Sequence, residues 1–155
     1  MVSTVGGRGD RASASAFEGI DAAALSDVLD AASDFALIVA PDGVIRDAWD
    51  AGLPEALRRA LIGRRWVDVV TVESRPKVEA ILAAAARPDR RKWREINFPL
   101  PGEPDYPARC LGVAFGADGR VIALGRDLRE TAALQTRLME AQAVMERDYA
   151  ALRFA

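Results

Sequence analysis

The feature that most constrains the fold of this chain is a stretch without glycine or proline near its carboxyl end, Thr131–Phe154, rich in Ala, Leu, Gln, Met and Glu. This composition predicts one continuous helix. At ~1.5 Å per residue the helix is roughly 40 Å long, more than a small domain needs to cover its own core. The apolar run before it, Val121–Leu124, predicts a strand, and Gly125-Arg126-Asp127 is expected to break that strand. A strand that turns into a projecting helix is suited to passing a signal or joining two chains.

The turn between this strand and the helix is the predicted signal-exit motif, which consists of Gly125, Arg126, Asp127 and Leu128. Asp127 is a good N-cap, because its carboxylate can accept hydrogen bonds from the first free backbone N–H groups of the helix. Glu130, three residues further on, has the spacing of a capping box. We therefore expect the helix to begin directly after Asp127.

The helix has an apolar seam with the alternating four-and-three spacing of a coiled coil, interrupted by Asp148. The seam residues are Leu134, Leu138, Ala141, Met145 and Leu152. A second, more polar stripe overlaps it in the neighbouring register: Leu128, Gln135, Leu138, Gln142, Met145, Tyr149 and Leu152. Two stripes suit a bundle or a helix that changes register, and the helix could instead pack back on its own domain. The charged face opposite the seam favours a dimerising helix.

Composition excludes several classes of protein. The chain has 155 residues, about half of them hydrophobic, which is enough for one modest domain. Its net charge of −2 argues against binding of nucleic acid through the phosphates. No apolar run reaches the length of a membrane span, so no membrane partner is expected. Residues 1–16 are predicted to be a disordered tail. The single cysteine, Cys110, excludes an internal disulfide and favours a cytoplasmic location.

The remaining pattern predicts an α+β fold. An amphipathic helix over Ile20–Ser33, opened by Asp21 or a neighbour, precedes the strands. Five strands and their connections follow: strand Phe35–Ala40, strand Val44–Trp49, short helical or irregular pieces Leu53–Leu61 and Trp66–Val70, helix Ser74–Ala86 with Ser74 as N-cap, strands Lys92–Phe98, Tyr106–Phe115 and Val121–Leu124, and a proline-rich loop Pro99–Pro107. The last three strands have short connections and are expected to form an antiparallel meander.

This order of elements resembles the PAS domain, with an Asp-Gly turn in Ala36–Val44 and the exit motif at Leu124–Glu130. The resemblance implies a five-stranded antiparallel sheet with flanking helices, an amphipathic N-terminal helix and a long projecting C-terminal helix. Further blocks resemble the amino-terminal PAS domain of the PpsR/CrtJ repressors: Gly63–Asp68, Thr71–Val78, Trp93–Asn97, Gly125–Leu128 and Ala141–Tyr149. That family controls photosynthesis genes in purple bacteria.

The resemblance also predicts a domain organisation. Residues 17–128 are expected to form the PAS domain with its N-terminal helix, and residues 129–155 the coiled-coil linker or signalling helix. In the family this glutamine-containing helix leads to further PAS domains and a helix-turn-helix, so DNA binding is expected only through domains absent from these residues. The implied partners are a second copy in a homodimer or higher homo-oligomer, and an antirepressor or a bacteriophytochrome.

No residue constellation predicts catalysis, a cofactor or a metal. The chain has no histidine, so an axial haem ligand, a zinc site and Ser/Cys–His catalysis are not expected. Cys110 lies in an alternating strand, outside the Asn-Cys-Arg context of a light-sensing flavin domain, and is interpreted as a small buried hydrophobe. The three tryptophans line a pocket or pack in the core or an interface: Trp49, Trp66 and Trp93. Gly112 marks a bulge or a close backbone approach.

From the sequence we expect a non-catalytic PAS dimerisation and signal-relay module of a bacterial transcriptional repressor of photosynthesis genes. The alternative is a ligand-binding sensor PAS domain that holds a flavin or a small metabolite.

Overall fold

The computed structural model describes residues 21–49 and 53–153. The predicted tail at residues 1–16 lies outside the described residues. The elements in chain order are α1 (Ala22–Ala32), β1 (Phe35–Val39), β2 (Ile45–Trp49), α2 (Glu55–Leu61), the 3-10 helices η2 (Trp66–Asp68) and η3 (Val72–Ser74), α3 (Arg75–Ala84), the 3-10 helix η4 (Pro88–Arg90), β3 (Arg94–Leu100), β4 (Glu103–Phe115), β5 (Arg120–Asp127) and α4 (Arg129–Arg153).

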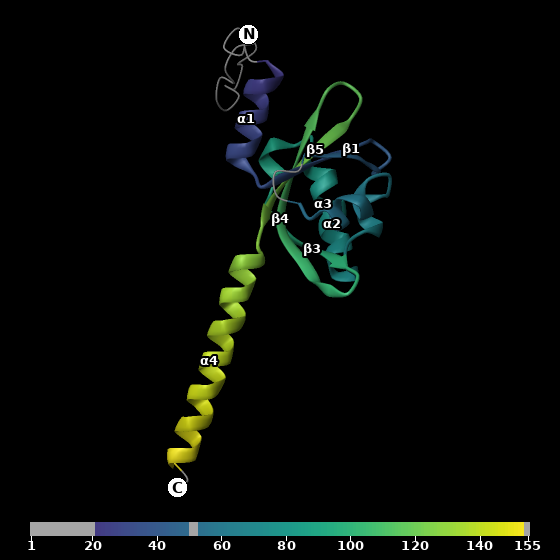
Figure 1. The fold of residues 1–155 in the computed structure, drawn as a ribbon. Helices are drawn as coiled ribbons and strands as arrows, with labels where there is room; N and C mark the ends of the chain where they lie inside the picture. The colour runs from purple at the N-terminus through teal and green to yellow at the C-terminus, as the bar shows by residue number, and fades with distance from the viewer. Residues whose placement is uncertain (1–20, 50–52, 154–155) are drawn as a thin grey trace, which may run out of the picture.

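The strands form one five-stranded sheet in the order β2-β1-β5-β4-β3, and every neighbouring pair is antiparallel. This confirms the predicted sheet and the meander of its last three strands. The first and last strands in the chain, β1 and β5, are neighbours at the centre, so the two ends of the domain meet there (Figure 1). Both α1 and α4 therefore leave the domain from the central strands.

One face of the sheet carries the hydrophobic core. Alternate residues along the strands point into it, as the period of a β-strand requires, and α2 and α3 lie beside it (Figure 1). The largest fully buried side chains include Trp66, Tyr106, Phe35 and Phe98. Gly112 of β4 lies against α3: a Cβ at this position would approach Ile81 Cγ2 to 2.8 Å. The expected close backbone approach at Gly112 is thus confirmed, and the pairing of β4 with β5 continues past it without a bulge.

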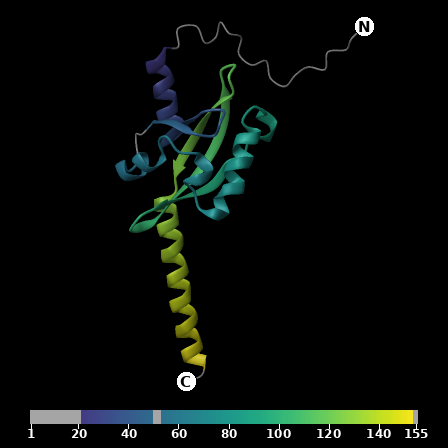
Figure 2. The same cartoon turned by 90° about the vertical axis from the view of Figure 1, so that its right-hand side faces the viewer.

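The two terminal helices extend in roughly opposite directions (Figures 1 and 2). The side chain of Asp21 caps α1 by accepting a hydrogen bond from Ala24 N at 2.9 Å, which confirms the predicted start of this helix. None of the residues of α1 is buried, and none of the 25 residues of α4 is buried either. Among the described helices, none combines the length and apolar character that a membrane crossing requires.

The expected break at Gly125-Arg126-Asp127 is wrong, because β5 continues through all three residues. The glycine has a packing role instead. The ring of Phe35 on the neighbouring strand occupies the space that a Cβ of Gly125 would fill, so only glycine leaves room for this ring against β5. Sequence alone does not distinguish a glycine that ends a strand from one that receives an aromatic ring.

The proline-rich loop predicted over Pro99–Pro107 is also wrong in extent. Strand β3 runs to Leu100 and β4 begins at Glu103, so only a tight turn remains between them. Pairing of β4 with β5 starts at Ala108, and the β4 residues before it pair with no strand other than β3. Proline is tolerated in a stretch that pairs with a strand on one side only, because fewer backbone N–H groups are needed there for strand pairing.

Ser74 does not act as the predicted N-cap of α3. Its side chain makes no cap hydrogen bond and is completely buried. Its hydroxyl accepts a hydrogen bond from Asn97 N at 2.9 Å and lies 2.9 Å from the hydroxyl of Thr71. Ser74 thus fastens the start of α3 to β3, a role that depends on a residue 23 positions away and has no local sequence signal.

Candidate functional site at the junction of the sheet and the terminal helix

Backbone hydrogen bonds fix the point at which the chain leaves the sheet. The backbone N–H of Asp127 donates to Asp34 Oδ2 at 2.7 Å, and the N–H of Asp34 donates to Gly125 O at 2.8 Å. The N–H of Leu128 donates to Pro107 O at 3.0 Å. Because the N–H of Asp127 is bound by Asp34, the predicted capping box with Glu130 does not form. The junction is instead held by residues from the start of β1 and from β4.

The carboxylate of Asp127 is bound by Arg129, the first residue of α4. It accepts from the backbone N–H of Arg129 at 2.9 Å and from the guanidinium Nη2 at 2.8 Å. Partial burial by itself raises the pKa of Asp127, but the hydrogen bonds and charge of Arg129 outweigh that effect, and the pKa lies below its usual value. The same contacts raise the pKa of Arg129. Asp127 thus satisfies a free N–H at the start of α4, as predicted, while it remains in β5.

An aromatic cluster connects this junction to the core. The Arg129 guanidinium lies 4.8 Å from the ring centroid of Tyr106, a cation–π contact. The Tyr106 ring packs edge-on against Phe35 and Phe98, with centroid separations of 6.1 and 6.4 Å. The Tyr106 hydroxyl is buried and has no hydrogen-bond partner among the described residues. Burial, and after it the negative charge of nearby Asp127, raises the pKa of this tyrosine.

Arg126, the remaining member of the exit motif, points away from this cluster. Its guanidinium lies 4.6 Å from the ring centroid of Trp93, next to the start of β3. The structure therefore divides the four predicted residues: Asp127 and Leu128 fasten the start of α4, Gly125 receives the Phe35 ring, and Arg126 binds the outer edge of the domain.

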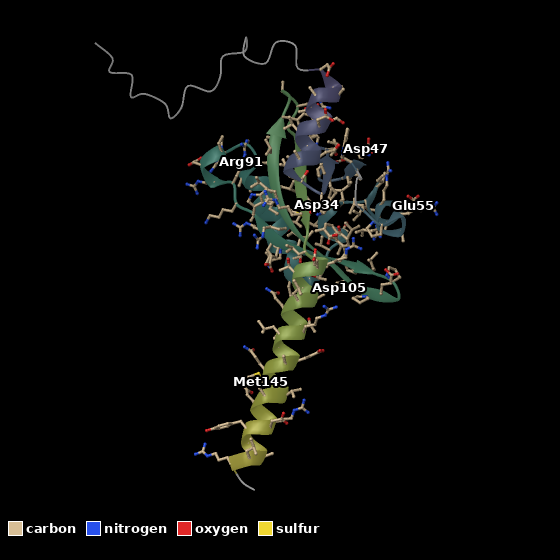
Figure 3. The ribbon with its side chains drawn as sticks, turned by 60° about the vertical axis from the view of Figure 1, so that its left-hand side comes forward. Asp34, Asp47, Glu55, Arg91, Asp105 and Met145 are labelled. Carbon is tan, nitrogen blue, oxygen red and sulfur yellow. The ribbon has the colours of Figure 1, made fainter. Side chains whose placement is uncertain are left out.

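The predicted seam residues lie on α4, beyond this junction. Their exposed fractions are 56% for Leu134, 60% for Leu138, 69% for Met145 and 79% for Leu152, and Ala141 is exposed as well. Within the part of one chain that the structure describes, no other element buries the seam. Figure 3 shows Met145 on a part of the helix that stands well clear of the domain.

Among the described residues, only the first turns of α4 face another element. A groove of about 590 Å³ lies between them and the β3–β4 hairpin, which carries Asp105, labelled in Figure 3. Its lining includes Leu100, Tyr106, Ala132 and Thr136. These α4 residues are on a different face from the seam, so the groove stays open when the seam is covered.

The other candidate residues are dispersed. Cys110 is completely buried, and burial raises the pKa of its thiol, which confirms its interpretation as a small hydrophobe. Trp66 lies in the core, Trp93 stacks with Arg126, and Trp49 is 40% exposed and donates to Asp30. The three tryptophans therefore do not line one pocket. Within residues 21–49 and 53–153, no group of three or more His, Cys, Asp or Glu side chains could hold a metal ion.

Sequence reasoning missed three residues of the junction: Asp34, Tyr106 and the side chain of Arg129. Asp34 lies 93 residues from its partner, and such a contact follows only from the pairing of β1 with β5. The Asp-x-Arg spacing at the start of α4 was the one local signal that could have identified Arg129.

These observations describe a PAS domain with its exit helix. The family model of the PAS fold matches residues 29–133, and the chain belongs to this family. The curated protein CrtJ of Rhodobacter capsulatus is 32% identical to the chain over 132 residues, which cover 83% of this chain. This similarity confirms the predicted relationship to the PpsR/CrtJ repressors. The chain spans 28% of the length of CrtJ.

The chain is also similar to solved structures at low sequence identity. The PAS domain of an HTR-like protein from Haloarcula marismortui matches with a TM-score of 0.46 and 16% identity, over 68% of this chain and 89% of that chain. An RNA-binding light-oxygen-voltage receptor matches with a TM-score of 0.49 and 18% identity, over 78% of this chain and 34% of that chain. Neither similarity bears on function.

Proposed function

We propose that the chain is a non-catalytic dimerisation and signal-relay module of a transcriptional repressor of photosynthesis genes. The observation that carries this proposal is the exposed seam of α4. Large apolar side chains repeated on one face of an otherwise polar helix are costly to leave in water, and they mark a surface that binds a partner. A second copy of the helix carries the same seam and is therefore a matching partner. The seam residues Leu138 and Met145 belong to both overlapping stripes, so they would face this partner in either register.

The relay would act through the junction. Asp127 is bound on one side to the sheet through Asp34 and on the other to α4 through Arg129. Arg129 contacts Tyr106, whose ring packs against Phe35. A displacement in the core therefore changes the position or angle of the first turn of α4, and this change would bias the register in which two helices pair.

The wider role rests on the relationship to CrtJ. Sequence similarity over most of this chain supports a regulatory role without catalysis. Contact with DNA would belong to other parts of the parent protein. By the same relationship, an antirepressor or a bacteriophytochrome would be the partner that delivers the signal.

The test is the oligomeric state of a variant in the seam. Leu138→Glu combined with Met145→Glu places two charges where a dry helix pair would have to desolvate them, at a cost of several kcal/mol. We expect the dimer to dissociate in analytical ultracentrifugation while the circular dichroism of the sheet stays unchanged.

The matched control, Ala143→Glu combined with Ala150→Glu, adds the same charges on the face of α4 opposite the seam. This variant should remain dimeric. A Leu138/Met145 variant that sediments as a dimer would refute the seam as the main interface and direct attention to α1 or the outer face of the sheet.

One observation favours a sensor domain as the second candidate. The indole Nε1 of Trp66 and the hydroxyl of Tyr106 are both buried, and neither has a hydrogen-bond partner among the described residues. A small ligand that offers acceptors could satisfy such groups. A stoichiometric flavin or haem spectrum that survives gel filtration would support this candidate, whereas protein without absorption beyond the aromatic band would support the proposed relay.

A further inference from the structure

A cluster of cations lies far from α4, in the segment Arg87–Arg94. Five of its eight residues are basic: Arg87, Arg90, Arg91, Lys92 and Arg94. The segment joins the end of α3 to the start of β3 and includes the short helix η4. Arg91 fastens this segment to the end of α3, whereas the proposed relay uses none of the five charges.

Hydrogen bonds hold the segment in a closed turn. Arg91 donates from Nε and Nη2 to the carbonyl oxygen of Ala85, at 2.9 and 2.7 Å, and the N–H of Ala114 donates to the same oxygen at 3.0 Å. Three donors thus satisfy a carbonyl at the end of α3, where the helix dipole would otherwise repel an anion. Figure 3 shows Arg91 in this turn, at the side of the domain opposite Glu55.

The other cations of the segment surround a cleft of about 590 Å³. Its wall is a strip of small side chains on α3: Ala80, Ala83 and Ala84. Its charged lining comprises Arg87, Arg90, Lys92 and Arg94, with Asp89 as the one carboxylate among the lining residues. Trp93 stacks with Arg126, whereas its neighbours Lys92 and Arg94 line the cleft.

No acidic side chain among the described residues forms an ion pair with these four cations. The ion pairs elsewhere engage other arginines; Glu95, directly after Arg94, pairs with Arg109 at 3.7 Å. Like charges gathered around one cleft repel each other, and without an anion they oppose the closed turn. This arrangement indicates an anionic ligand that would occupy the cleft.

We propose that the cleft binds a small polyanion with clustered phosphate groups, of about the size of a nucleotide. One guanidinium group can donate two parallel hydrogen bonds to the oxygens of a phosphate. A volume of this order suits a small organic ligand. The alanine wall offers an apolar surface to the less polar part of such a ligand. A long polyanion is disfavoured, because the chain as a whole carries a net charge of −2, whereas a compact ligand experiences only the charges within a Debye length.

This inference does not depend on the relay through α4, since the cleft and the seam share no residue. The experiment measures binding of pyrophosphate and of ADP to the full chain by isothermal titration calorimetry at low ionic strength. The variant is Arg90→Gln combined with Arg94→Gln. The control, Arg46→Gln combined with Arg59→Gln, removes two exposed arginines that pair with Asp42 and Glu55 outside the cleft.

We expect saturable binding of one ADP per chain, with ADP bound more tightly than pyrophosphate because of the alanine wall. Loss of two guanidinium groups should weaken binding by about tenfold or more, while the control binds like the unchanged chain. Absence of a saturable signal, or equal weakening in variant and control, would overturn the proposal. Tighter binding of a DNA duplex through the same residues would also overturn it, because the site would then serve a nucleic-acid backbone.

Discussion

Replacing Gly125 by alanine tests the packing that connects the sheet to the exit helix. At a strand position with ordinary φ this substitution normally stabilises a protein by ~0.4–1 kcal/mol, because alanine restricts the unfolded chain. Here the added Cβ would overlap the Phe35 ring, which is 1% exposed and enclosed by Phe98 and Tyr106. Ring and strand must therefore move apart, and the substitution is expected to lower the stability of the protein instead of raising it.

The size of the effect follows from the confinement of the ring. Overpacking a tight core costs about 1–3 kcal/mol, and here the ring has aromatic neighbours on two sides, which favours the upper part of this range. For a domain of this size, each kcal/mol lowers Tm by roughly 3–5 °C. We expect Gly125→Ala to lower Tm by about 6–15 °C in a thermal scan followed by circular dichroism.

A second substitution separates this contact from a general weakening of the strand. Phe35→Leu shortens the ring side chain and should relieve the overlap, so the double variant should lose less stability than the sum of the two single variants, by more than ~0.5 kcal/mol. An unchanged or raised Tm for Gly125→Ala would refute the reasoning. Strict additivity of the two substitutions would do the same.

The remaining predictions concern the core, a buried hydroxyl and the junction. Cys110→Ala should destabilise the chain by about 1 kcal/mol, as a small cavity does, and oligomeric state should not respond to reductant; a cysteine-dependent response would indicate a redox switch. Ser74→Ala should cost about 1–3 kcal/mol in urea unfolding, because Asn97 N–H loses its acceptor; a neutral effect would mean that water replaces the hydroxyl. Burial opposes the lowered pKa of Asp127 but Arg129 outweighs it, so this stabilisation is complete above the unfolded pKa of about 4 and is lost as pH falls through the folded pKa. Asp127→Asn should flatten the acid limb of the stability profile, and an unchanged limb would contradict the assigned pairing.

The elements that the sequence predicts well are those whose signals are local. The N-cap at Asp21, the meander of the last three strands and the long helix after Asp127 each follow from periodicity, turn residues or the absence of helix breakers within a few positions. The seam of α4 is likewise a local pattern, and its role as an interface stays a prediction; in the structure its large apolar side chains are exposed. For this reason the amino-acid sequence by itself determines the fold class and the outline of the exit helix.

Tertiary structure decided what depends on contacts between distant residues. The roles of Gly125 and Ser74 differ from their local reading because an aromatic ring from β1 and an N–H from β3 reach them. The pairing of β1 with β5 brings Asp34 to Asp127, and the end of α3 gathers the cations of residues 87–94 around a cleft. A one-dimensional pattern records which side chains can share a face of one element, whereas the neighbours across elements are set by strand order and register, and these are decided only when the whole core packs together.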